Sequence, residues 1–177
     1  VALEAMLIAV EGGAQAAMLA PTEILARQHH ETLTRLAAGT SVTIALLTGR
    51  DKGRPRESIL MGLMDGSIDI VVGTHAIFQD TVSYRNLALA VIDEQHRFGV
   101  EQRSALAEGR SPHVLHMTAT PIPRTLALTV YGDLSVSEIT APPADRKPIV
   151  TAWVTDDRSS EAYERLTRHL RDGRQAY

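Results

Sequence analysis

The sequence predicts an α/β fold built on a mostly parallel sheet with helices on both faces. Apolar runs alternate along the chain with amphipathic stretches, which is the order expected of strands joined by helices. The apolar runs are continuous rather than alternately apolar and polar, and this is typical of strands buried on both faces. The chain has 177 residues, which is enough for one domain and the beginning of another.

Amphipathic stretches in the first part of the chain predict three helices, at residues 1–13, 22–38 and 54–66. Thr22 is placed to act as the N-cap of the second helix. One face of that helix carries His29 together with Leu25, Leu33 and Leu36. We therefore expect His29 to pack in the core rather than to act as a ligand.

Five apolar runs predict strands before residue 120, at residues 14–21, 41–49, 68–75, 87–94 and 114–120. Pro121 and Pro123 then open a short helix with apolar residues at helical spacing.

The composition changes at TAPPADRKP, where prolines and charges indicate an extended linker. We interpret residues 1–141 as one domain, 142–148 as a linker and 149–177 as the beginning of a second domain. In that last part residues 149–154 predict a strand, and a helix follows with Ser159 or Ser160 as its cap. Because the chain starts within a helix and stops within an incipient strand, we expect both ends to be cut points in a longer protein.

Composition excludes several classes of protein. The chain has no cysteine, and so it forms no disulfide scaffold and no zinc site with thiolate ligands. No apolar run approaches the roughly 20 residues that cross a bilayer, and no signal peptide is recognisable, so we expect a cytoplasmic protein. The formal net charge of −3 argues against a polybasic nucleic-acid binder. Backbone N–H groups and hydroxyls can nevertheless hold phosphate.

Polar clusters follow four of the predicted strands. The clusters are Pro21-Thr22-Glu23, Gly73-Thr74-His75, Asp93-Glu94-Gln95-His96 and Thr118-Ala119-Thr120. Each alone could be an ordinary turn or cap. The carboxyl ends of parallel strands meet at one edge of a sheet, however, and ligands bind at that edge. The four clusters together therefore predict a binding site.

Asp93 and Glu94 end an apolar run and predict phosphate chemistry. An aspartate in that position suits a hydrated Mg²⁺, which proteins hold through few carboxylates plus phosphates. The neighbouring glutamate could polarise a water for attack on phosphorus. The simpler alternative is a solvent-facing acidic turn. His96 could couple to this pair or could be a hydrogen-bonded structural histidine.

A nucleotide site of this kind also needs a phosphate cradle, with the pattern G-x-x-x-x-G-K-[ST]. The lysines of the chain are Lys52 and Lys147, and neither follows a glycine. The cradle is therefore absent from the sequence. In a P-loop fold it precedes a helix like the one predicted at residues 1–13, so we expect the chain to begin just after it.

Four motifs resemble those of superfamily-two helicases. APTEILARQH resembles motif Ia, VGTHAIFQ motif Ib, VIDEQHRFGV the Walker B motif and TATPIPRT motif III. Together they resemble the bacterial RecG family of ATP-dependent DNA helicases, which remodel stalled forks and Holliday junctions. The resemblance implies a RecA-like P-loop NTPase domain at residues 1–141 and the start of a second RecA-like domain at residues 149–177.

The resemblance also implies roles for individual residues. Asp93 would bind Mg²⁺, Glu94 would activate water, and both would contact ATP. Gln95 and His96 would sense the nucleotide and pass its state to Thr118, Ala119 and Thr120. The DNA path would include Pro21, Thr22, Glu23, Gly73, Thr74, His75 and Arg124. For Arg124 the alternative is a surface arginine at the start of a helix.

Other expectations follow from the family. The cofactors would be ATP and Mg²⁺, and the partner would be branched or forked DNA, with a single-strand binding protein as a further partner. We expect a monomer in the bacterial cytoplasm, associated with the nucleoid and not with a membrane. Without the cradle, the chain by itself is predicted not to hydrolyse ATP.

Two alternatives remain open. Transcription-repair coupling translocases (the Mfd family) share HRFGV and TATPIPRT, but they typically have DEEH where this chain has DEQH. They also typically have a lysine where this chain has Ala76. The second alternative is a non-catalytic domain that binds DNA or a protein partner.

Overall fold

The computed structural model describes residues 1–93, 112–119, 135–141 and 149–176. The chain divides into two compact units, Val1–Pro123 and Arg124–Tyr177, and each is described by itself. The division of the chain at residues 141 and 149 that the sequence indicates stays a prediction.

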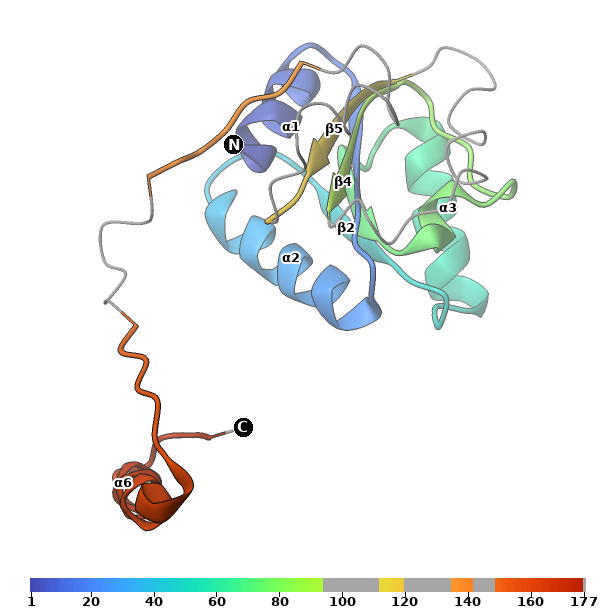
Figure 1. Cartoon of the computed structure of the whole chain (residues 1–177). Coiled ribbons are helices and arrows are strands. Elements are labelled where there is room, and N and C mark those ends of the chain that lie inside the picture. Colours follow the sequence, from blue (N-terminus) through green and yellow to red (C-terminus); the bar gives the residue numbers. More distant parts are fainter. Residues whose placement is uncertain (94–111, 120–134, 142–148, 177) are drawn as a thin grey trace. The chain divides into compact units, whose positions relative to one another are not determined.

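The first unit contains a five-stranded sheet in which all neighbouring strands run parallel (Figure 1). The strand order is β2-β3-β1-β4-β5. The strands are β1 (Gln15–Leu19), β2 (Ile44–Leu47), β3 (Ile70–Gly73), β4 (Leu87–Asp93) and β5 (His113–Met117). The predicted parallel α/β architecture and its five strands are confirmed.

Helices cover both faces of the sheet (Figure 1). They are α1 (Ala2–Glu11), α2 (Glu23–Leu36) and α3 (Gly53–Asp65). Gly66 ends α3 with a left-handed backbone (φ 82°), a conformation that costs glycine little. The three predicted helices are thus confirmed, with each end within two residues of the expected position.

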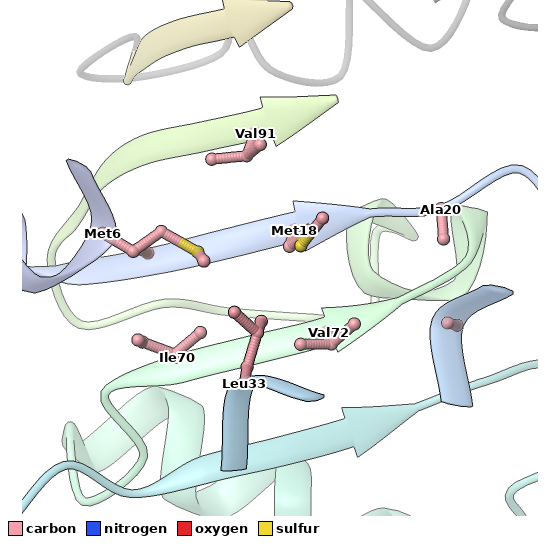
Figure 2. Close-up of a cluster of buried hydrophobic side chains, with 9 residues drawn as sticks. Met6, Met18, Ala20, Leu33, Ile70, Val72 and Val91 are labelled. Atoms are coloured by element: carbon pink, nitrogen blue, oxygen red, sulfur yellow. The ribbon is translucent and has the colours of Figure 1, made fainter. Parts of the chain in front are cut away.

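The core consists of two apolar clusters, one on each face of the sheet. One cluster packs Met6 of α1 and Leu33 of α2 against sheet residues such as Met18, Ile70 and Val91 (Figure 2). The other joins Leu63 of α3 to the opposite face. Residues of β1 alternate between the clusters, with Ala16 and Met18 in the first and Ala17 and Leu19 in the second. Both sides of the strand are therefore buried, which explains its continuous apolar sequence.

The apolar stripe of α2 is only partly buried. Leu33 is 6 % exposed, whereas Leu36 in the last turn is 62 % exposed. The apolar face predicted from the spacing therefore continues past the buried part of the helix.

The second unit contains α6 (Ser159–Arg171), preceded by the short helix η3 (Asp156–Arg158). The predicted helix is confirmed, but its N-cap is Arg158 rather than Ser159 or Ser160. Residues 149–154 form no strand. A strand needs a neighbour to satisfy its backbone, and residues 149–176 include no other strand to provide one.

Within the part of the chain that the structure describes, no helix is long and apolar enough to span a membrane.

Candidate nucleotide and nucleic-acid site

The predicted site residues that the structure describes lie at the carboxyl edge of the sheet. Because the five strands are parallel, the residues that end or follow them lie along one edge. Those in the described ranges are Pro21, Thr22, Glu23, Gly73, Thr74, His75, Asp93, Thr118 and Ala119. The predicted site residues Glu94, Gln95, His96, Thr120 and Arg124 lie outside the described residues.

The start of α2 shows how Thr22 and Glu23 are used. The Thr22 hydroxyl accepts a hydrogen bond from the Leu25 backbone N–H at 3.3 Å, so Thr22 is the N-cap that the sequence predicts. The Glu23 carboxylate binds two guanidinium groups, that of Arg27 at 2.8 Å and that of Arg50 at 3.0 Å. Glu23 therefore holds a pair of arginines beside the helix start.

Arg50 belongs to a loop that follows β2 and is fixed by its own side chains. The Asp51 carboxylate accepts from the backbone N–H of Thr48 at 2.6 Å and from its hydroxyl at 2.9 Å. Thr48 is fully buried, so the loop is anchored in the fold. Arg50 itself is 83 % exposed and Arg27 is 54 % exposed. The two exposed guanidinium groups thus lie where a phosphate could reach them.

The segment after β3 is constrained by close packing. A Cβ on Gly73 would lie 2.0 Å from the Leu47 carbonyl oxygen of the neighbouring strand, so only glycine fits. Thr74 is buried and leads into the short helix η1 (His75–Phe78), where His75 is exposed. The Tyr84 hydroxyl donates to the Ile77 carbonyl at 2.8 Å and secures this helix. Burial raises the pKa of the Tyr84 hydroxyl, which stays protonated and able to donate.

Asp93 makes a contact that the sequence did not predict. Its Oδ2 atom lies 2.7 Å from Nε2 of His29, and the side chains are 18 % and 29 % exposed. The expectation that His29 is a core-packing residue is therefore wrong. Helix α2 starts at the carboxyl edge of the sheet, so its second turn is still close to the end of β4.

The surroundings of Asp93 fit a hydrated magnesium ion better than a metal ion whose ligands all come from the protein. The residues that the structure describes contain no group of three or more histidine, aspartate or glutamate side chains that could hold a metal. Mg²⁺ commonly keeps several waters and binds one or two carboxylates together with substrate phosphates. A single half-buried carboxylate at the sheet edge meets that requirement.

Sequence reasoning missed Arg27, Arg50 and the contact of His29. Arg27 follows Glu23 by four residues within one helix, a spacing that predicts an ion pair. That signal was available in the sequence. The contacts of Arg50 and His29 join separate elements of the fold, and local sequence patterns do not encode them.

Comparison with known proteins places the chain in a family. Residues 1–129 match the family described as DEAD/DEAH box helicase. The ATP-dependent DNA helicase RecG of Bacillus subtilis is 50 % identical over 178 residues, covering 100 % of this chain and 26 % of the relative. RecG of Treponema pallidum is 48 % identical, covering 95 % of this chain and 26 % of the relative. The chain thus spans about a quarter of the length of these relatives.

Solved structures give the same result. A structure of RecG bound to a three-way DNA junction matches with a TM-score of 0.84 and 41 % identity, covering 97 % of this chain and 23 % of that one. A DEAD box protein from Methanococcus jannaschii matches with a TM-score of 0.54 and 25 % identity, covering 69 % and 36 %. The predicted resemblance to RecG and the RecA-like fold are confirmed. The chain belongs to the DEAD/DEAH box helicase family.

Proposed function

We propose that the chain is part of the motor of an ATP-dependent DNA helicase that remodels stalled forks and Holliday junctions. The main support is that those residues of the helicase-like motifs that the structure describes lie at the carboxyl edge of one parallel sheet, the edge where such folds bind ligands. Similarity to RecG over nearly the whole chain adds to this. In this proposal ATP binding and hydrolysis alternately close and open a cleft between two RecA-like domains.

Asp93 and Glu94 have the central chemical roles. Asp93 would hold the cation through its carboxylate at the end of β4. Bound Mg²⁺ would neutralise negative charge on the phosphates of ATP while the γ-phosphoryl group is transferred to water. Glu94 would orient the attacking water and accept its proton. Gln95 and His96 would report the state of the nucleotide to Thr118, Ala119 and Thr120.

The DNA path would run along the same edge. The exposed Thr22 and His75 would contact the phosphate backbone through a hydroxyl and an imidazole, and Pro21, Gly73 and the buried Thr74 would shape the path. Arg124 would contribute a further contact. Such contacts carry no sequence information, as a motor that moves over any sequence requires.

The arginine pair alters the role that we give to Glu23. An anionic carboxylate repels phosphate, but Glu23 holds Arg27 and Arg50 at 2.8 and 3.0 Å. We therefore assign the phosphate contacts to the two arginines and a supporting role to Glu23.

The proposed substrate is branched DNA in the bacterial cytoplasm, with the protein on the nucleoid as a monomer and with a single-strand binding protein as a further partner. The relative in the solved structure is bound to a three-way junction, which supports this class of substrate. ATP and Mg²⁺ are the proposed cofactors.

The experiment is junction unwinding by the full-length protein that contains this chain. A fluorescently labelled three-way junction is mixed with protein, ATP and Mg²⁺, and strand separation is followed over time. Glu94→Gln should slow strand separation about 100-fold or more, because a general base is lost. Binding of a fluorescent ATP analogue should persist in this variant. Unwinding by Glu94→Gln at the unaltered rate would contradict the proposal.

A further inference from the structure

We propose that His29 is a positioning residue for the Asp93 carboxylate. The hydrogen bond of its Nε2 atom to Oδ2 would fix the orientation of the carboxylate and leave Oδ1 for the cation. The inference rests on the proposed function, because it takes Asp93 as the residue that meets Mg²⁺.

The contact joins two well-anchored elements. His29 lies in the second turn of α2, which Thr22 caps at its start and which the buried residues Ala26 and Leu33 fix against the sheet. Asp93 is the last residue of β4, which pairs with both β1 and β5. The imidazole and the carboxylate therefore meet because the fold brings them together, and not through the flexibility of an exposed loop.

The geometry is that of a polar contact rather than of apolar packing. The two atoms are 2.7 Å apart, a short hydrogen-bond distance, and both side chains are half-buried. Among the described ranges of the chain, His29 is the side chain that the structure places on this carboxylate. Burial limits competition from water, so the contact can hold one rotamer of Asp93.

Such a contact matters because a metal-binding carboxylate needs a fixed orientation. An unsupported carboxylate rotates and offers either oxygen to the cation. Residues that hydrogen-bond a metal ligand orient it, and their removal typically lowers metal affinity about 10- to 100-fold. His29, which lies on α2, would orient Asp93 in this way.

The test compares two substitutions of His29 in the full-length protein. His29→Leu removes the hydrogen-bond donor and puts an apolar side chain in its place. His29→Gln keeps an N–H donor, which can reach the carboxylate from the same position. His30→Leu is the matched control, because it removes the neighbouring histidine of the same helix.

The first readout is binding of Mn²⁺, used in place of Mg²⁺, measured by electron paramagnetic resonance in the presence of ADP. His29→Leu should raise the apparent Kd for Mn²⁺ about 10-fold or more. His29→Gln should recover most of the affinity, and His30→Leu should match the unaltered protein. A Kd that His29→Leu leaves unaltered would overturn the proposal, as would a failure of His29→Gln to recover affinity in a folded protein.

The second readout is the Mg²⁺ concentration that gives half-maximal ATP hydrolysis. His29→Leu should raise this concentration. The kcat at saturating Mg²⁺ should stay near that of the unaltered protein, because excess cation fills the weakened site. A lower kcat with no change in the Mg²⁺ requirement would indicate a structural role and overturn the proposal.

The contact itself can be tested in the 177-residue chain by NMR of the histidine ring nitrogens. Asp93→Asn should shift the His29 signals, whereas Asp69→Asn should leave them in place. Unshifted His29 signals in Asp93→Asn would overturn the contact. If instead the unaltered full-length protein neither binds Mn²⁺ with ADP nor hydrolyses ATP, the proposed function fails, and the role of His29 fails with it.

Discussion

Gly73 shows how one residue type in a helicase-like motif can be required by packing. Its place at the end of β3 suggests a role on the DNA path. In the structure, however, a side chain at this position would collide with the Leu47 carbonyl and with Cγ2 of Ile77, at 2.0 and 2.4 Å. The neighbouring strand and η1 leave no room for a methyl group. Glycine is therefore needed for the fold whatever its role in binding.

We predict that Gly73→Ala destabilises the chain by about 1–3 kcal/mol or more, because the backbone of two strands must move apart. Urea unfolding followed by circular dichroism measures this change. Gly49→Ala is the control, because a Cβ there meets nothing within 4 Å. Equal effects of the two substitutions would contradict the packing argument.

Arg50 carries a prediction about DNA. In the full-length protein Arg50→Gln should weaken duplex binding and should reduce the slope of log K against log salt by about 0.9, because one phosphate contact is lost. Arg35→Gln, in the last turn of α2, removes the same charge away from the carboxyl edge and should leave the slope unaltered. Fluorescence anisotropy at several salt concentrations measures both. Equal slopes in Arg50→Gln and the unaltered protein would remove Arg50 from the DNA path.

At this scale the sequence predicts local features and misses long-range ones. Thr22 is predictable as a cap because its hydroxyl and the Leu25 N–H that donates to it lie in one short segment. His29 was misassigned because its partner lies 64 residues away. A histidine on an apolar helix face has the same sequence signal whether it packs in the core or meets a carboxylate.

At the scale of elements, Gln15 links β1 to the end of α3 and to the segments that precede β3 and β4. Its buried side-chain amide donates to the Leu63 and Ile68 carbonyls at 2.9 and 2.8 Å, and its oxygen accepts from the Asn86 backbone N–H at 3.0 Å. It thus holds the end of α3 and the residue before β4. The pairing of β1 with β4 also shifts register between Gln15 and Ala16. A polar residue at the start of an apolar strand is explained by these three backbone partners.

We predict that Gln15→Leu costs about 1–3 kcal/mol of unfolding free energy, because the buried Ile68 carbonyl loses its amide donor and the Leu63 carbonyl keeps only the Arg85 backbone N–H. Chemical denaturation measures the loss. Gln28→Leu, at an exposed position of α2, should have a much smaller effect. A Gln15→Leu chain as stable as the unaltered one would show that water replaces the amide.

The central strands of the first unit were predictable because β1 and β3 are buried along their whole length, on both faces of the sheet. The run at residues 149–154 has the same pattern but forms no strand. Its apolar side chains are exposed, with Trp153 at 86 %. An apolar run shows that a segment can form a strand, but the strand forms only where a neighbouring strand pairs with it.

At the scale of the whole molecule, the two units differ in how they are stabilised. The buried clusters belong to the first unit, whereas α6 contains no buried residue. We predict that a chain ending at residue 141 unfolds with the same free energy as the 177-residue chain, within about 0.5 kcal/mol, as for changes away from a core. Urea unfolding of both chains tests this, and a clear loss of stability on shortening would refute it.

The 177-residue chain alone should not hydrolyse ATP, because its sequence contains no phosphate cradle of the G-x-x-x-x-G-K-[ST] type. Phosphate release from the purified chain, with ATP, Mg²⁺ and DNA present, measures this. Turnover above that of an Asp93→Asn control would contradict the prediction, since it would show that other residues replace the cradle.

The central claim is that this chain is part of a DNA-dependent motor, and ATP hydrolysis by the full-length protein tests it most directly. The rate is measured without DNA and with a three-way junction, for the unaltered protein and for Glu94→Gln. We predict that the junction stimulates hydrolysis and that Glu94→Gln lowers the stimulated rate about 100-fold or more. A rate that is the same with and without the junction, or that survives in Glu94→Gln, would contradict the claim.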